Sequence, residues 1–211
     1  MIPEGPRPAA PAAATERAAG VRELILAVVV LCALALGGSR LTMLLQYDRE
    51  AVAAGQYWRL LTAHLVHLGW DHLALNVAGL AGLWWLYGEL YSARQWLVLV
   101  IACAILISLA LYLASPGVAW YVGLSGVLHG LWAAGALRLY RTSRLESLAA
   151  LSVLLVKLLL EYRFGPLSAG PGDGLPVLTV AHRYGALAGL ASASLAAAAA
   201  AAGKHRRRQS L

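Results

Sequence analysis

Charged residues are scarce in this chain. They make up 13% of its 211 residues, whereas 60% are hydrophobic. Soluble domains carry about 25% charged residues, so the composition favours an integral membrane protein. The two cysteines, Cys32 and Cys103, both lie inside apolar runs, which makes a disulfide framework unlikely. The net charge is +7, but the basic residues lie in the tails and in the short loops between apolar runs. This distribution argues against nucleic-acid binding.

Long apolar runs divide the chain into candidate membrane spans. A helix needs about 20 mostly apolar residues to cross a bilayer. The first run, Leu24 to Leu36, also resembles the core of a signal peptide, but it serves equally well as an uncleaved first helix. The sequence predicts an all-α membrane protein with six spans, at about 22–40, 70–88, 95–114, 120–140, 145–161 and 177–202.

The segments outside the spans set the predicted domain organisation. Residues 1–21 are rich in Pro and Ala and predict a disordered cytoplasmic tail, residues 22–202 form the six-helix domain, and residues 203–211 form a basic cytoplasmic tail. With both termini in the cytoplasm, most arginines and lysines outside the spans fall on the inner side, as the positive-inside rule requires.

Polar residues gather at one depth in three of these spans. Ser125 and His182 each lie a few residues from the outer end of their span, roughly 7–9 Å deep at 1.5 Å per residue, and His72 and Asn76 lie at the outer start of another span. His72 and Asn76 are four residues apart and share one helix face. Polar residues inside a membrane are costly, so a functional site is expected near the outer side.

Small residues favour close contact between the helices that carry Ser125 and His182. Gly126 and Gly130 are four residues apart in one span, and Gly185 and Gly189 are four apart in the other. This spacing lets helix backbones approach closely in lipid. The two side chains are therefore expected within hydrogen-bonding distance of each other.

A serine beside a histidine has a plain chemical use. The imidazole activates the hydroxyl as a nucleophile, and it later protonates the leaving group. The Asn76 amide, the His72 ring and the Ser125 backbone N–H are candidate donors to an oxyanion. Because the sequence places no Asp or Glu obviously beside His182, it predicts a Ser–His dyad, without a third residue.

At this point the motifs match a family. The chain resembles the rhomboid intramembrane serine proteases, through YWRLLTAHLVHLGWDHLALN (57–76), GLSG (123–126) and AHRYG (181–185). The resemblance implies a six-helix bundle with Ser125 as nucleophile and His182 as general base. It places His72 and Asn76 in the oxyanion hole. The neighbouring residues of the implied active site are Gly123, Gly126, His129 and Gly185.

Within that superfamily the chain is most similar to the rhombosortases. The similar stretches are SGVLHG (125–130), KLLLEYRFGP (157–166) and PVLTVAHRYGA (176–186). This implies a bacterial inner-membrane enzyme whose active site opens to the periplasmic side. The implied partners are exported proteins with a C-terminal anchor, made of a Gly-Gly motif, a transmembrane helix and a basic end, with cleavage near that motif.

Three further features leave alternatives open. Many rhomboid proteases have an aromatic residue four positions after the serine, packed on the histidine, where this chain has His129. Lys157 and Glu161, four apart, are either a buried ion pair or contacts for the substrate. The loop 165–176 is either a mobile lid over the site or a plain connector.

Two rival functions follow from the same residues. One is a catalytically inactive rhomboid-like protein that binds clients, although such proteins usually lack the Ser or the His. The other is a membrane metalloenzyme or transporter that uses His64, His67 and the other histidines. The spacing of these histidines is not a standard zinc pattern, so no metal and no cofactor are expected.

Overall fold

Helices dominate the computed structural model, which describes residues 10–167 and 177–209. The helices are α1 (Ala10–Leu36), α2 (Gly38–Leu45), α3 (Arg49–Ala53), α4 (Arg59–Thr62), α5 (Trp70–Tyr87), η1 (Gly88–Leu90), α6 (Ala93–Ala114), α7 (Ser125–Leu139), α8 (Arg144–Phe164) and α9 (Thr179–Gln209), and two short strands are β1 (Tyr47–Asp48) and β2 (Trp120–Tyr121). The expectation of a mostly helical fold is confirmed.

The long helices follow the predicted spans, with differences at their ends. Helix α1 begins at Ala10, so the predicted disordered tail was wrong for residues 10–21, where the many alanines favour helix. Residues 1–9 of that tail lie outside the described part. Helix α7 begins at Ser125 and not near residue 120, because residues 120–121 pair with residues 47–48 as antiparallel strands. Helix α9 continues to Gln209, through most of the predicted basic tail.

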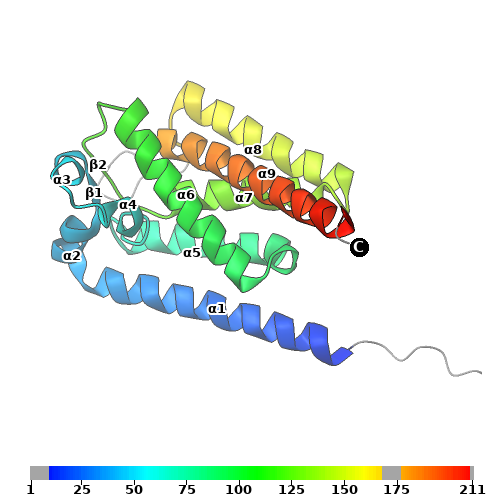
Figure 1. The fold of residues 1–211 in the computed structure, drawn as a ribbon. Helices are drawn as coiled ribbons and strands as arrows, with labels where there is room; N and C mark the ends of the chain where they lie inside the picture. Colours follow the sequence, from blue (N-terminus) through cyan, green and yellow to red (C-terminus); the bar gives the residue numbers. More distant parts are fainter. Residues whose placement is uncertain (1–9, 168–176, 210–211) are drawn as a thin grey trace, which may run out of the picture.

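Helix α7 occupies the centre of the bundle. It packs against α5, α6, α8 and α9, and most of its residues from Gly126 to Ala136 are buried. Helix α1 lies along the outer side of α5 (Figure 1). The short elements α2, α3, α4, β1 and β2 gather at one end of the bundle, and the start of α1 and the end of α9 lie at the other (Figure 1).

Two arginines fix the short elements. The Arg49 guanidinium donates to the carbonyls of Leu111, Tyr112, Ser115 and Val118, at 2.6–3.1 Å, at and just beyond the C-terminal end of α6. A cation is favourable there because the last carbonyls of a helix lack intrahelical partners. Arg59, which is buried, donates to the Met43 and Gln46 carbonyls and to the Gln56 side chain. These bonds hold the segment that leads into α5.

One helix of the described residues, α6, is by itself long and apolar enough to cross a membrane. Residues 20–36 and 38–45 meet the same condition only together, as a pair bent by 110°. Helix α7 has 15 residues, fewer than the roughly 20 of a full span, and α8 carries Lys157 and Glu161 in its second half. The count of six spans therefore remains a prediction.

Candidate active site

Ser125 and His182 lie within hydrogen-bonding distance. The Ser125 Oγ is 2.9 Å from the His182 Nε2. Ser125 is the first residue of α7, and His182 lies in the first turn of α9. The two side chains that the sequence predicted to meet are therefore in contact, at the end of the bundle where the short elements gather.

Paired glycines let the two helices come this close. A Cβ atom at Gly185 would overlap the Gly126 carbonyl, and one at Gly189 would overlap the Gly130 carbonyl. A side chain at either α9 position would push α9 away from α7. The glycine spacing therefore sets the distance between Ser125 and His182, as the sequence predicted.

A turn that requires glycine carries the chain into Ser125. Gly123 has a φ of +113°, a conformation that side chains rarely adopt. Its N–H donates to the Ala63 carbonyl at 2.9 Å, and its carbonyl accepts a 2.6 Å bond from the Tyr121 hydroxyl. The turn is thereby fixed just before the nucleophile candidate, and the first N–H groups of α7 follow it without intrahelical partners.

A carboxylate lies on the far side of His182. The Glu161 Oε2 is 2.8 Å from the His182 Nδ1, and Glu161 is buried. Lys157 donates to the other oxygen of the same carboxylate. The sequence-based expectation that no acidic residue lies beside His182 was therefore wrong. Glu161 is the fourth residue from the C-terminal end of α8 and His182 is the fourth residue of α9, so the depth argument used for Ser125 would have found the contact.

His129 also contacts the pair. Its ring stacks on the His182 ring, with centroids 4.1 Å apart and 10° between the planes. Its Nδ1–H donates to the Ser125 carbonyl at 2.7 Å, which leaves the lone pair on Nε2. His129 thus occupies the place that the resemblance gives to an aromatic residue packed on the histidine.

The two predicted oxyanion donors differ in position. His72 lines the same cleft as Ser125, and its ring lies so close to Gly123 that a Cβ there would be 2.7 Å from Cε1. The His72 Nδ1 is buried and has no hydrogen-bond partner among the described residues. Asn76 is buried, and its amide donates to the His72 carbonyl at 2.9 Å. Only one of its two N–H groups is used in that bond.

A cleft gives access to Ser125. Its volume is about 260 Å³, and it is bounded by residues 117–122 on one side. The other walls come from Leu68, His72, Val177 and Leu178. The loop 165–176, predicted as a lid or a connector, lies outside the described residues from residue 168 onward.

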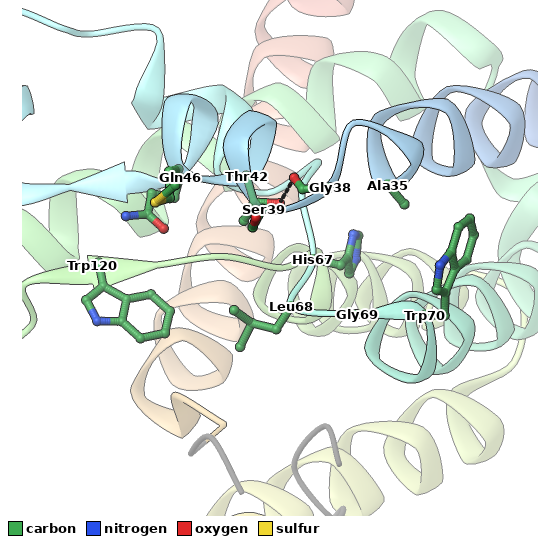
Figure 2. A pocket seen from close by; sticks show the side chains of 11 residues that line it. Ala35, Gly38, Ser39, Thr42, Gln46, His67, Leu68, Gly69, Trp70 and Trp120 are labelled. Atoms are coloured by element: carbon green, nitrogen blue, oxygen red, sulfur yellow. Dashed lines mark hydrogen bonds between the residues drawn. The ribbon is translucent and has the colours of Figure 1, made fainter. Parts of the chain in front are cut away.

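A larger hollow of about 390 Å³ adjoins this cleft (Figure 2). It lies between the α1–α2 bend, around Gly38 and Thr42, and the segment that contains His67 and Trp70. Leu68 and Trp120 line both hollows. Although it is larger, it contains neither Ser125 nor His182, and the candidate chemistry belongs to the smaller cleft.

The remaining histidines do not form one cluster in the described structure. The His64 Nε2 is 3.0 Å from both the Ala104 carbonyl and the Ser108 hydroxyl, which is a structural role. The described group with metal-binding potential is instead His129, Glu161 and His182. Imidazole lone pairs lie in the ring plane, and the two rings are stacked nearly parallel. A single ion cannot lie in both planes, so the group is poorly suited to a metal.

Comparison with known proteins defines the class. The family model of the rhomboid domain matches residues 54–199, which is more than half of the chain and includes every candidate site residue. The chain therefore belongs to the rhomboid family, a family of membrane proteins.

One curated relative adds detail. The chain is similar to the rhomboid protease GluP of Bacillus subtilis (strain 168), with 31% identity over 83 residues. The match covers 39% of this chain and 16% of that relative.

Proposed function

We propose that the protein is an intramembrane serine endopeptidase, with Ser125 as nucleophile and His182 as general base. The observation that carries the proposal is the 2.9 Å contact between the Ser125 Oγ and the His182 Nε2, at the wall of a cleft. Membership of the rhomboid family and the similarity to a rhomboid protease support it. An inactive client-binding relative would have no need of this pair.

The reaction follows from the geometry. The Ser125 oxygen attacks the carbonyl carbon of the scissile bond while His182 Nε2 takes the hydroxyl proton, and the carbonyl electron pair moves onto the oxygen. The intermediate collapses by breaking the C–N bond, and the His182 imidazolium protonates the leaving amine. Water then attacks the acyl-enzyme, His182 accepts its proton, and Ser125 recovers a proton as the carboxylic acid leaves.

The developing oxyanion needs donors on the other side of the carbonyl. His72 borders the cleft, and the first N–H groups of α7, which have no intrahelical partners, lie next to Ser125. Asn76 has a second amide N–H available beside the one that it gives to the His72 carbonyl. Loss of one such donor typically raises the barrier by about 3–4 kcal/mol.

The substrate is a membrane-anchored protein. We place its scissile bond at a Gly-Gly-type motif before a C-terminal transmembrane anchor with a basic end, as in the substrates of rhombosortases. Glycine suits the site because it costs a helix about 1 kcal/mol relative to alanine, so the chain unwinds there and exposes its peptide bond. The cleft opens to the periplasmic side of a bacterial inner membrane, with six spans and both termini in the cytoplasm.

The test is a reporter protein with such an anchor, reconstituted with the enzyme in lipid vesicles. Wild type should release the reporter. Ser125→Ala and His182→Ala, reconstituted in the same amount as wild type, should each abolish release. Release that persists in either variant contradicts the mechanism. Mass spectrometry of the product locates the bond and distinguishes a free carboxylate from an acyl group transferred to an amine.

Two further measurements test whether the protein is an active serine enzyme and whether it is specific for the Gly-Gly motif. A fluorophosphonate probe should label wild type and not Ser125→Ala, and failure to label wild type would favour the inactive rhomboid-like alternative. Replacing the glycines of the anchor by valines should suppress release. Equal release from both anchors would leave the endopeptidase intact and remove the Gly-Gly specificity.

A further inference from the structure

Four side chains form a continuous chain of hydrogen bonds across three helices. Ser125 on α7 contacts His182 on α9, His182 contacts Glu161 on α8, and Glu161 contacts Lys157 on the preceding turn. We propose that Glu161 is a positioning residue that fixes the tautomer of His182, and that Lys157 keeps Glu161 in its charged form. This inference rests on the proposed function and adds a third and a fourth residue to its Ser–His pair.

The tautomer argument depends on what a carboxylate can do. An ionised carboxylate only accepts hydrogen bonds, so the 2.8 Å contact with Glu161 requires the proton of neutral His182 to lie on Nδ1. The lone pair then lies on Nε2, which faces the Ser125 hydroxyl. With the opposite tautomer, Nε2 would carry a proton and could not act as the base.

The charge of Glu161 needs a partner because the carboxylate is buried. A lone carboxylate inside a protein in lipid favours its neutral form, since burial disfavours charge. A neutral Glu161 could donate a hydrogen bond to Nδ1 and would then favour the wrong tautomer. Lys157 counters this effect, since its ammonium group donates directly to Glu161. Its side chain is 29% exposed, so the cation itself is less completely buried than the carboxylate.

Other titratable groups near His182 do not replace Lys157. His129, on α7, stacks on the ring and gives its Nδ1–H to the Ser125 carbonyl. His72, on α5, lies on the Gly123 side of the cleft. Arg183, the neighbour of His182 in the chain, places its guanidinium 4.9 Å from the centre of the Tyr162 ring. Within the described residues, Lys157 is the cation in direct contact with the carboxylate.

A purely structural role would make different predictions. If Glu161 served only to join α8 to α9, then glutamine, which keeps its size and one acceptor oxygen, would be milder than alanine. If Glu161 fixes the tautomer, glutamine should be at least as harmful as alanine. The amide N–H₂ of the introduced glutamine can donate to Nδ1 and so hold the proton on Nε2, whereas alanine leaves both tautomers accessible.

The experiment measures kcat, KM and fluorophosphonate labelling against pH for the full-length protein in vesicles. At neutral pH, Glu161→Gln should lower kcat by about 10²- to 10⁴-fold with little change in KM, and Glu161→Ala should be no worse. The matched control is Glu146→Gln, the same change at an exposed position at the other end of α8, and it should leave kcat unchanged. Thermal unfolding of each variant reports separately on packing.

The role of Lys157 is tested by removing its positive charge. Lys157→Met keeps the apolar stem and removes the cation, so the acid limb of the pH profile should move to higher pH by about one unit or more. Activity should return towards wild type as the pH rises and Glu161 ionises. Lys157→Arg keeps the cation and should restore the wild-type profile.

The outcomes separate this inference from the proposed function. Wild-type kcat and pH profile in Glu161→Gln would overturn the role of Glu161, and an unshifted profile in Lys157→Met would overturn that of Lys157. A Glu161→Ala variant that is less active than Glu161→Gln, with a matching loss of thermal stability, would show a packing role only. Activity that persists in Ser125→Ala would instead overturn the proposed function itself.

Discussion

The His129 ring lies flat against the His182 ring, 4.1 Å away between centroids, while its Nδ1–H is bonded to the Ser125 carbonyl. One side chain of α7 thus contacts both members of the proposed catalytic pair. The stacked ring limits rotation of His182 about its side-chain bonds. The hydrogen bond ties the same ring to the first turn of its own helix.

For kcat, the flat shape of the ring at position 129 should matter more than its nitrogen atoms. His129→Phe keeps the stack, and kcat should stay within about fivefold of wild type. His129→Ala removes the ring and leaves His182 free to shift, and a misplacement of about 1 Å can cost 10²-fold in rate. Steady-state cleavage of the anchored reporter gives both values. Equal losses in the two variants would show that the bond to the Ser125 carbonyl is the more important contact.

A Cβ at Gly123 should displace His72. Gly123→Ala would place a methyl group 2.7 Å from the His72 Cε1, in addition to the strain of a φ of +113°. We expect kcat to fall by about 10²-fold, with KM little changed, because the proposed oxyanion donor moves. The control is Gly55→Ala, with a φ of +94° and nothing within 4 Å of its Cβ. It carries similar backbone strain, about 1–3 kcal/mol, without the contact.

The comparison of these two variants separates effects at the active site from the general cost of backbone strain. Both should lose thermal stability, but only Gly123→Ala should lose catalytic rate. Wild-type kcat in Gly123→Ala would argue that the position of His72 is unimportant for the reaction.

The contact between α7 and α9 should tolerate no side chain at Gly185. Gly185→Ala would set a methyl group against the Gly126 carbonyl, which is backbone and cannot rotate away. We expect a loss of about 1–3 kcal/mol in unfolding free energy, together with slower fluorophosphonate labelling of Ser125. The control is Gly82→Ala on α5, where nothing lies within 4 Å and alanine should stabilise the helix by up to about 1 kcal/mol. Equal stability of the two variants would contradict the close packing.

Acid should destabilise the fold through His64, which lies in the connection between α4 and α5. Burial lowers the pKa of His64 from 6.5 to about 4. Between these values the unfolded chain binds a proton that the folded chain excludes, so stability falls as the pH falls from about 6.5 to 4 and then levels off. The loss from this residue is at most roughly 3 kcal/mol.

Unfolding in detergent at pH 7.5 and pH 4.5 measures this effect. His64→Gln, which keeps a donor for the Ala104 carbonyl, should show a smaller difference between the two pH values than wild type. The His67 ring titrates by the same physics, since burial also lowers its pKa to about 4, so part of the pH dependence should remain. An unchanged difference in the variant would contradict the assignment.

The positions of the long helices could be predicted because each depends on local sequence. A long run of apolar residues must be removed from water, which marks it as a membrane helix. The run that forms α6 was expected at 95–114, and the helix extends from Ala93 to Ala114. The ends were less predictable. Residues 120–121 became a strand because they pair with residues 47–48, a partner more than 70 positions away that no local pattern reveals.

The sequence by itself determined that Ser125 and His182 would meet. Both lie near the same end of their helices, and the glycines beside them leave no side chain to hold α7 and α9 apart. Only the tertiary structure decided what surrounds the pair: Glu161 and Lys157 behind His182, the His129 ring on its face, and the Asn76 amide turned to the His72 carbonyl. Those contacts depend on the rotation of each helix about its own axis, which is set by packing against all of its neighbours at once.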